Sequence, residues 1–336
     1  MNKASNVKKS ICIGLFLIAS FLFNIVPHSY SLLMYSLLAI SFGVVSYFSS
    51  AVTLLVCSAI SYLFVLLSYC ITVPGKEVFY EAFRVFLFVC PVSFFAGFAI
   101  KKKYDFHTLY TGSNLIFVLA IMLHIMKLVM IDKVSIVQSY IRIPFSLMMN
   151  TANMSDIPHL IAGQGIDSDV INYIVNSIVS SLPSVIIIFS MILTFVFIFV
   201  LKKIIRLFDS EQNFSSLVPF SHLKLKRRTV LTLFVLYLVS IFLSGTSGIV
   251  VGNIISILIV MCMGCGLSLI DFYFKKAIRN WVIRVFIYLT GFGFISLLFA
   301  LLPFVNPLML IALVGMIDAS RDFRKIDKFD IKIIFK

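Results

Sequence analysis

Charged side chains are scarce in this sequence: only 12% of its 336 residues are Asp, Glu, Lys or Arg, against about 25% in a soluble domain. Acidic residues are the scarcest, with 14 Asp and Glu against 28 Lys and Arg. Hydrophobic residues make up 61% of the chain, and 35 residues are Phe. A soluble fold cannot hide so much apolar surface behind so few charges. The composition therefore excludes an ordinary soluble protein and makes lipid the solvent.

Motifs for catalysis, nucleotides and metals are also absent from the sequence. It has no Walker loop, no HExxH and no GxSxG, and its five His are scattered. Cys262 and Cys265 have the spacing of a redox or metal pair but lack a second Cys or His cluster. No basic and aromatic stripe typical of a nucleic-acid-binding module is present. We therefore expect no enzyme, no cofactor, no metal site and no nucleic-acid partner, and we interpret the cysteines as structural.

Apolar runs long enough to cross a hydrocarbon core of ~30 Å recur along the whole chain. They cover 10–27, 31–48, 51–73, 82–100, 110–131, 182–201, 229–246, 248–270 and 280–303, and a shorter run covers 306–318. The last run is either a short, broken span or part of a re-entrant pair, because Pro303 and Pro307 interrupt its start. The pattern predicts an all-α fold, in which 1–336 form a single polytopic transmembrane bundle of about ten spans (eight to ten).

The cations have a one-sided distribution relative to these runs. If the N-terminus is cytoplasmic and every run crosses, all but five of the 28 Lys and Arg lie inside. The five exceptions are Lys76, Arg84, Lys127, Lys133 and Arg142. The positive-inside rule then places both termini in the cytoplasm, with the cations near anionic lipid head groups.

Two connections and the tail are longer than simple turns. The extracytoplasmic 132–181 segment is either an amphipathic segment on the outer leaflet or a lid over an outward-facing cavity. Near its end, Asp167-Ser168-Asp169 resembles the N-cap of a helix that runs into the sixth span, with a kink expected near Pro183. The basic cytoplasmic loop 202–228 suits an interfacial helix and turn or a docking site, and the basic tail 319–336 is also cytoplasmic.

Several segments of the chain carry a family resemblance. They are PVSFFAGFAIKKK at 91–103, FVLKKIIRLF at 199–208 followed by Val218-Pro219-Phe220, GCGLSLIDFYFKK at 264–276, and GMIDASRDFRK at 315–325. Together they resemble the YybS-like family of bacterial multi-pass membrane proteins, which contains a domain of unknown function (number 2232). That family is similar in membrane architecture to the substrate-binding S components of energy-coupling-factor vitamin transporters. The resemblance implies this architecture for most of the chain, from which 132–181 departs. It also implies a location in a bacterial inner (cell) membrane, and it implies no particular substrate.

A few ionisable residues lie within or beside the apolar runs, where such groups are candidates for function. Glu81 and Arg84 are three residues apart at the outer entry of the fourth span, and His124 and Lys127 are three apart near the outer end of the fifth. We predict that these four residues bind a small anionic or zwitterionic ligand. The alternative is that Arg84 and Lys127 extend to the outer interface while Glu81 neutralises Arg84.

A second set of residues is predicted to dock a cytoplasmic partner: Arg206, Arg227, Arg228, Asp318, Arg321 and Arg324. For Asp318, a structural ion pair with neighbouring cations is the alternative. The sequence thus favours a non-enzymatic substrate-binding or transport-related component that depends on a cytoplasmic ATPase. The alternative function is a membrane scaffold that recruits cytoplasmic or envelope-assembly proteins.

A glycine-rich segment lies between two of the predicted spans. Gly245-Thr246-Ser247-Gly248 predicts a tight turn, whose backbone donors are an alternative contact for a ligand. Gly248 and Gly252 have the GxxxG spacing that permits close helix packing.

Overall fold

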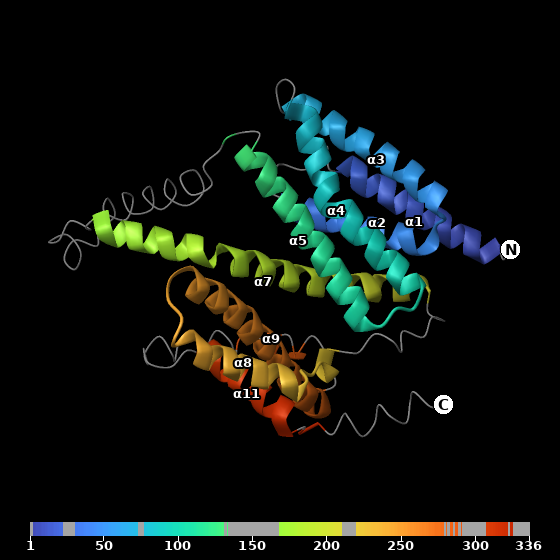
Figure 1. Ribbon diagram of the computed structural model, residues 1–336. Coiled ribbons are helices and arrows are strands. Elements are labelled where there is room, and N and C mark those ends of the chain that lie inside the picture. The colour runs from blue at the N-terminus through green and yellow to red at the C-terminus, as the bar shows by residue number, and fades with distance from the viewer. Residues whose placement is uncertain are drawn as a thin grey trace. The chain divides into compact units, whose positions relative to one another are not determined.

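The described part of the chain is helical. The computed structural model describes residues 3–22, 31–72, 77–130, 133, 168–209, 220–278, 280, 283–284, 286–287, 290, 307–321 and 323–324. All regular elements among these residues are helices (Figure 1), which confirms the all-α prediction for this part of the chain. They belong to two compact units, here treated one at a time. Unit 1 comprises Met1–Val179 and Phe189–Leu217, and unit 2 comprises Ser180–Ile188 and Val218–Lys336.

Unit 1 is built from the N-terminal helices, whose bounds follow the predicted apolar runs. They are α1 (Lys3–Leu22), α2 (Ser31–Phe48), α3 (Ala51–Thr72), α4 (Glu77–Lys101), α5 (Phe106–Met130) and most of α7 (Ser168–Phe208). The first four pack around Phe16, Phe42 and Val65, each with at most 1% of its surface exposed. The rings of Phe16 and Phe42 meet edge to face at 4.5 Å, a favourable geometry for aromatic pairs.

Helices α2 and α4 approach each other at glycine. A Cβ added to Gly97 would lie 2.3 Å from the carbonyl oxygen of Gly43, so no larger side chain fits between the backbones. At the same crossing the hydroxyl of Ser46 donates a hydrogen bond of 3.0 Å to the carbonyl of Phe94. Small residues and interhelical hydrogen bonds of this kind drive helix association in lipid.

Helix α7 is the longest element, with 41 residues. Its described residues begin at Ser168, and it continues through Pro183. The predicted N-cap includes Asp167, which lies outside the described residues. In unit 1 it packs on α5, where Tyr110 donates to the carbonyl of Met191 at 3.2 Å and Ser190 donates to the Asn114 amide oxygen at 2.6 Å. The remainder of the predicted outer segment, 134–167, lies outside the described residues.

Unit 2 contains the C-terminal helices. They are the single 3₁₀ turn η3 (Phe220–His222), α8 (Arg227–Ser240), α9 (Gly245–Ala277) and α11 (Pro307–Arg321). Helices α9 and α11 cross almost without side chains between them. A Cβ on Gly315 would lie 2.0 Å from the carbonyl oxygen of Cys262, and one on Gly266 would lie 2.1 Å from that of Ile311.

The predicted glycine turn was wrong in its position. The chain turns at 241–244, and Gly245 starts α9 with a φ of +63°, a left-handed conformation that suits glycine. The predicted packing role of Gly252 is also not observed among the described residues, because a Cβ there would meet nothing within 4 Å. The close packing uses Gly266 and Gly315 instead, which the sequence analysis did not select.

Four of the described helices are long and apolar enough to cross a membrane: Val78–Lys101, Phe106–Met130, Val175–Phe208 and Gly245–Ala277. Shorter apolar helices cover Ser10–Ser20, Met34–Phe48 and Ala51–Leu67. The predicted run 280–303 lies mostly outside the described residues. A total of about ten spans therefore stays a prediction.

Candidate functional sites

The first predicted pair, Glu81 and Arg84, forms an ion pair on α4. Their side chains are 20% and 32% exposed, so the pair is partly covered by neighbouring helices. The hydroxyls of Tyr35 on α2 and Tyr69 on α3 lie close enough to interact electrostatically with the Arg84 guanidinium. Arg84 thus faces polar groups from three helices, and two of its partners, both tyrosines, were not identified from the sequence.

The second predicted pair, His124 and Lys127, meets α4 through Tyr80. The Tyr80 hydroxyl and Nδ1 of His124 share a hydrogen bond of 2.8 Å, in which either group can be the donor. The Lys127 ammonium lies 3.6 Å from the centre of the Tyr80 ring, within the range of a cation–π interaction. The ring of Phe88 packs edge-on against the His124 imidazole at 5.6 Å.

All of these polar residues gather at one end of unit 1. Helices α2 and α4 begin there, while α3 and α5 end there. Tyr80 precedes Arg84 by one helical turn, so α4 carries a tyrosine, an acid and a base on adjacent faces. We name this set the outer polar cluster: Tyr35, Tyr69, Tyr80, Glu81, Arg84, His124 and Lys127. The Glu81–Arg84 pair contributes to the cluster from α4, and Tyr80 of the same helix contacts His124 and Lys127 of α5.

The opposite end of unit 1 holds most of its described basic residues. Lys101 donates a 2.9 Å hydrogen bond to the carbonyl of Ser49, and Tyr47 donates to the Asp209 carboxylate at 3.0 Å. These contacts join the last turns of α2, α4 and α7. The cations at this end are Lys101, Lys102, Lys103, Lys202, Lys203 and Arg206.

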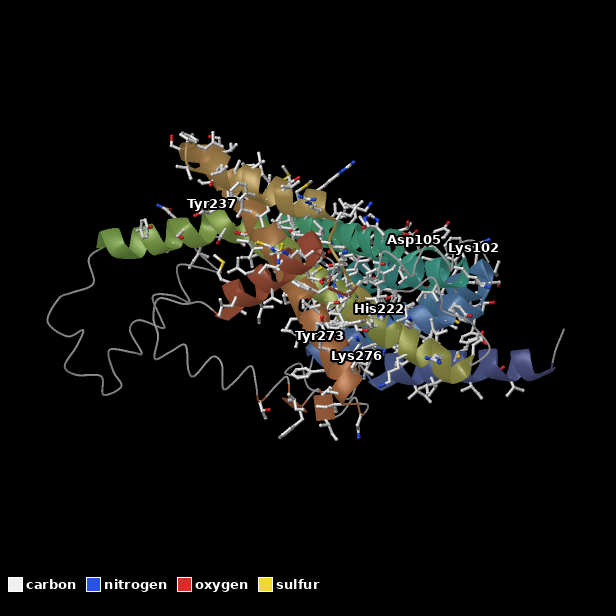
Figure 2. The ribbon with its side chains drawn as sticks, turned by 90° about the horizontal axis from the view of Figure 1, so that it is seen from below. Lys102, Asp105, His222, Tyr237, Tyr273 and Lys276 are labelled. Carbon is white, nitrogen blue, oxygen red and sulfur yellow. The ribbon has the colours of Figure 1, made fainter. Side chains whose placement is uncertain are left out.

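Asp105 caps helix α5 at this basic end, beside Lys102 in the turn (Figure 2). Its carboxylate accepts hydrogen bonds from the Thr108 hydroxyl at 2.6 Å and from the Thr108 backbone N–H at 3.3 Å. Chiefly because the Thr108 hydroxyl stabilises the charged form, the pKa of Asp105 is lowered. The carboxylate is exposed, and its contacts satisfy one of the free N–H groups of the first turn.

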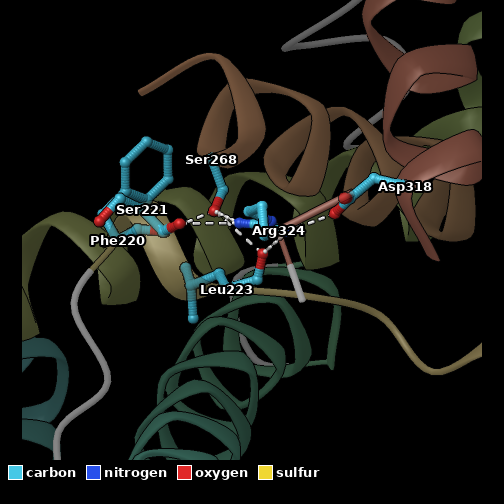
Figure 3. Close-up of polar contacts among 6 residues, drawn as sticks. All are labelled: Phe220, Ser221, Leu223, Ser268, Asp318 and Arg324. Carbon is cyan, nitrogen blue, oxygen red and sulfur yellow. Dashed lines mark hydrogen bonds and ion pairs between the residues drawn. The ribbon is translucent and has the colours of Figure 1, made fainter. Parts of the chain in front are cut away.

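Unit 2 contains a buried ion pair between Asp318 on α11 and Arg324 just beyond it (Figure 3). Both side chains are fully buried, and Arg324 Nη2 lies 2.5 Å from Asp318 Oδ2. The same guanidinium donates to the carbonyls of Ser221 at 2.8 Å and Leu223 at 2.7 Å, and to the Ser268 hydroxyl at 2.7 Å. We name this set the Arg324 network.

The network joins three parts of unit 2. Ser268 lies on α9 and itself donates to the carbonyls of Phe220 at 2.6 Å and Leu223 at 2.9 Å. The arginine therefore holds the end of α11 against α9 and the segment that precedes α8. Asp318 Oδ1 and Arg324 Nε have no hydrogen-bond partner among the described residues. Buried charges of this kind need several compensating partners.

The six residues predicted to dock a partner differ in their exposure. Arg206, Arg227, Arg228 and Arg321 are exposed, whereas Asp318 and Arg324 are buried. The buried two do not present a surface to a partner in this arrangement, and their contacts correspond to the alternative of a structural ion pair. A second structural pair joins Arg284 and Asp271 at 3.0 Å.

The cysteines are free thiols in the described structure. Cys262 and Cys265 are buried on α9 at the crossing with α11, as packed small residues. Among the described residues, no group of three or more His, Cys, Asp or Glu side chains is placed to hold a metal ion.

Long apolar helices with polar clusters at their ends define a multi-pass helical membrane protein. The chain belongs to a family described as predicted membrane proteins with a domain of unknown function, DUF2232, whose sequence model matches residues 77–319. The family resemblance predicted from the motifs is thereby confirmed. No curated protein and no solved structure gives a significant match.

Proposed function

We propose that this protein is a non-enzymatic, substrate-binding component of a transport system, comparable to the S component of an energy-coupling-factor transporter. The outer polar cluster carries the proposal, because it places Arg84 and Lys127 among apolar helices at one end of unit 1. A charged side chain within lipid costs ~2.5–3.5 kcal/mol at the centre of the membrane and less near its surface. Ionisable residues within membrane spans are rare, and they commonly mark functional sites.

The charges of the cluster suit a small anionic or zwitterionic ligand. Arg84 and Lys127 are cations, Glu81 is the single carboxylate of the cluster, and three tyrosines supply hydroxyl groups. The net charge of the cluster is therefore +1 when His124 is neutral. A ligand carboxylate or phosphate would gain bidentate hydrogen bonds from Arg84, and Glu81 would accept a ligand ammonium group.

The membrane orientation is part of the proposal. In unit 1 the outer polar cluster and the basic residues lie at opposite ends, which supports a cytoplasmic position for the basic end. We propose about ten spans in a bacterial inner membrane, with both termini in the cytoplasm. Energy would come from a cytoplasmic ATPase, since the sequence has no Walker loop.

Ligand-induced stabilisation of the purified protein tests the proposal. We would measure the unfolding midpoint with a panel of amino acids, dicarboxylates and phosphorylated vitamins, because a ligand that binds only the folded state raises the midpoint. We expect an anionic or zwitterionic member to stabilise the wild type, and Arg84→Gln and Lys127→Gln to abolish that stabilisation.

The matched control is Lys133→Gln, which removes an exposed cation outside the cluster. It should leave the ligand response unchanged. If Lys133→Gln lost the response as fully as Arg84→Gln, binding would reflect overall charge and the site would be excluded. A panel without any stabilising member would count against transport.

The second candidate function is a scaffold, and the exposure of Arg206, Arg227, Arg228 and Arg321 favours it. Co-purification from native membranes separates the two functions. A bound ATPase pair would support transport, whereas envelope-assembly proteins lost in an Arg206→Gln variant would support the scaffold.

A further inference from the structure

Unit 2 carries exposed cations on three chain segments that are far apart in sequence. They are Arg227 and Arg228 at the start of α8, Lys275 and Lys276 at the end of α9, and Arg321 at the end of α11. We name these five residues the basic end of unit 2. None of them forms an ion pair with a carboxylate within the part of the chain that the structure describes.

The Arg324 network connects these three segments through hydrogen bonds and an ion pair. Arg324 ties Asp318 of α11 to Ser268 of α9 and to the carbonyl of Leu223. Lys276 lies eight residues beyond Ser268 on the same helix, which is ~12 Å. Arg227 follows Leu223 by four residues, at most ~14 Å of chain. The buried pair therefore joins, at one network, the three chain segments that carry the five exposed cations.

The two carboxylates of unit 2 that the structure describes already have arginine partners. Asp318 pairs with Arg324, and Asp271 pairs with Arg284 at 3.0 Å, with side-chain exposures of 15% and 14%. Both described acids of unit 2 are thus bound to other arginines. The five exposed cations therefore have no carboxylate partner among the described residues, and their positive charge attracts anions.

Aromatic rings at the end of α9 indicate the depth of this region in the membrane. The Lys276 ammonium lies 4.6 Å from the centre of the Phe272 ring and 5.7 Å from that of Tyr273. Figure 2 shows Tyr273 and Lys276 close together near the end of the helix. Tyrosine beside lysine, after a long apolar helix, is typical of the head-group layer.

We propose that the basic end of unit 2 is a binding site for the phosphate head group of an anionic phospholipid, and that Asp318 and Arg324 are the positioning residues that assemble it. Basic sites between membrane helices on the cytoplasmic side hold such head groups. The face predicted above to dock a cytoplasmic protein is then occupied by lipid. This site is independent of the outer polar cluster and of its ligand.

Native mass spectrometry of the delipidated protein tests the proposal with phosphatidylglycerol and phosphatidylcholine of equal acyl chains. The wild type should bind phosphatidylglycerol more tightly. Arg227→Gln with Arg228→Gln should weaken that binding about 30-fold, since each basic residue contributes ~1 kcal/mol. Lys102→Gln with Lys103→Gln, which removes as many exposed charges from unit 1, should weaken it less than about 3-fold, an effect smaller than one basic residue would give.

A charge-neutral variant separates an assembled site from general attraction. Asp318→Asn with Arg324→Gln keeps the net charge and removes no exposed cation. We expect it to weaken phosphatidylglycerol binding about 10-fold. The three segments would separate, so the head group would lose one or two of its basic contacts, each worth ~1 kcal/mol. Ser268→Ala, which removes one hydroxyl from the network, is the milder variant if the first does not accumulate.

Three results would overturn the proposal. The first is equal weakening by the unit 1 and unit 2 double variants, which would make the attraction general. The second is unchanged binding in both Asp318→Asn with Arg324→Gln and Ser268→Ala, with helix content preserved by circular dichroism. The third is displacement of phosphatidylglycerol by a hexaglutamate peptide at lower concentration than the lipid, which would assign the surface to an acidic protein.

Discussion

At the scale of single residues, the stability of unit 2 depends on the buried ion pair of the Arg324 network. Asp318→Ala leaves the guanidinium of Arg324 buried without its carboxylate, which should lower the free energy of unfolding by ~3–5 kcal/mol. Asp318→Asn with Arg324→Gln should cost less, because neither charge remains. Thermal unfolding in detergent measures both. Arg321→Gln, exposed and three residues from Asp318, should change the stability by no more than ~0.5 kcal/mol.

Asp105 gives a pH-dependent prediction. Its pKa is lowered in the folded protein, so its contribution to stability is present above the unfolded pKa of ~4 and is lost as the pH falls through the folded value. Asp105→Ala should therefore destabilise the protein by about 1 kcal/mol at pH 7. The difference between the two proteins in unfolding midpoint should disappear in acid. A difference of equal size at pH 7 and pH 3 would contradict the capping role.

The sequence identified some of these residues but not their neighbours. The spacing of Glu81 and Arg84 predicted their ion pair, because residues three apart on a helix share a face. Tyr35 and Tyr69 come from other helices, and only the packing of the unit brings them to Arg84. Arg324 was assigned to a docking surface because a basic tail is normally solvated, whereas the chain folds back and buries it.

The crossing of α9 and α11 gives a prediction at the scale of elements. Gly315→Ala places a methyl group 2.0 Å from the carbonyl oxygen of Cys262, so the helices must separate. Overpacking of this kind costs ~1–3 kcal/mol. Gly252→Ala is the matched control on α9, with nothing within 4 Å of the added carbon. The prediction fails if both variants unfold at the same midpoint.

Helix packing could be predicted only in part. The GxxxG spacing drew attention to Gly248 and Gly252, yet spacing alone does not say which face of a helix meets a neighbour. Cys262 and Gly266 have the same small-residue spacing, and both lie at the observed crossing, where they meet Gly315 and Ile311. By contrast, the apolar pattern predicted a helix that continues past Pro183, as α7 does.

The orientation in the membrane is the prediction for the whole molecule. Lys103→Cys in the turn before α5 and Ser244→Cys in the turn before α9 are both exposed positions. We expect an impermeant thiol reagent to label Ser244→Cys in intact cells and Lys103→Cys only after permeabilisation, in a background where exposed Cys70 is replaced by Ala. Labelling of Lys103→Cys in intact cells would reverse the orientation.

At this scale the sequence predicted the helical class and the family, which the composition and the motifs support directly. It also predicted a single membrane domain over 1–336, whereas the described residues form two compact units. Because the apolar runs and the cations indicate only crossings and sides, they carry no information on which helices associate. The single-domain prediction and the number of spans stay predictions.

Helix α8 has a consequence for the lipid around it. Its 14 residues reach only ~21 Å, less than the ~30 Å of a typical hydrocarbon core. Phe242 follows it and is 86% exposed, which places an apolar ring at the edge of the hydrocarbon, two residues before Ser244 on the water side. A short hydrophobic element is accommodated by local thinning of the bilayer, at a cost that grows with the mismatch. Unit 2 would then respond to membrane thickness, and it should be more stable in bilayers of shorter acyl chains than in thick ones.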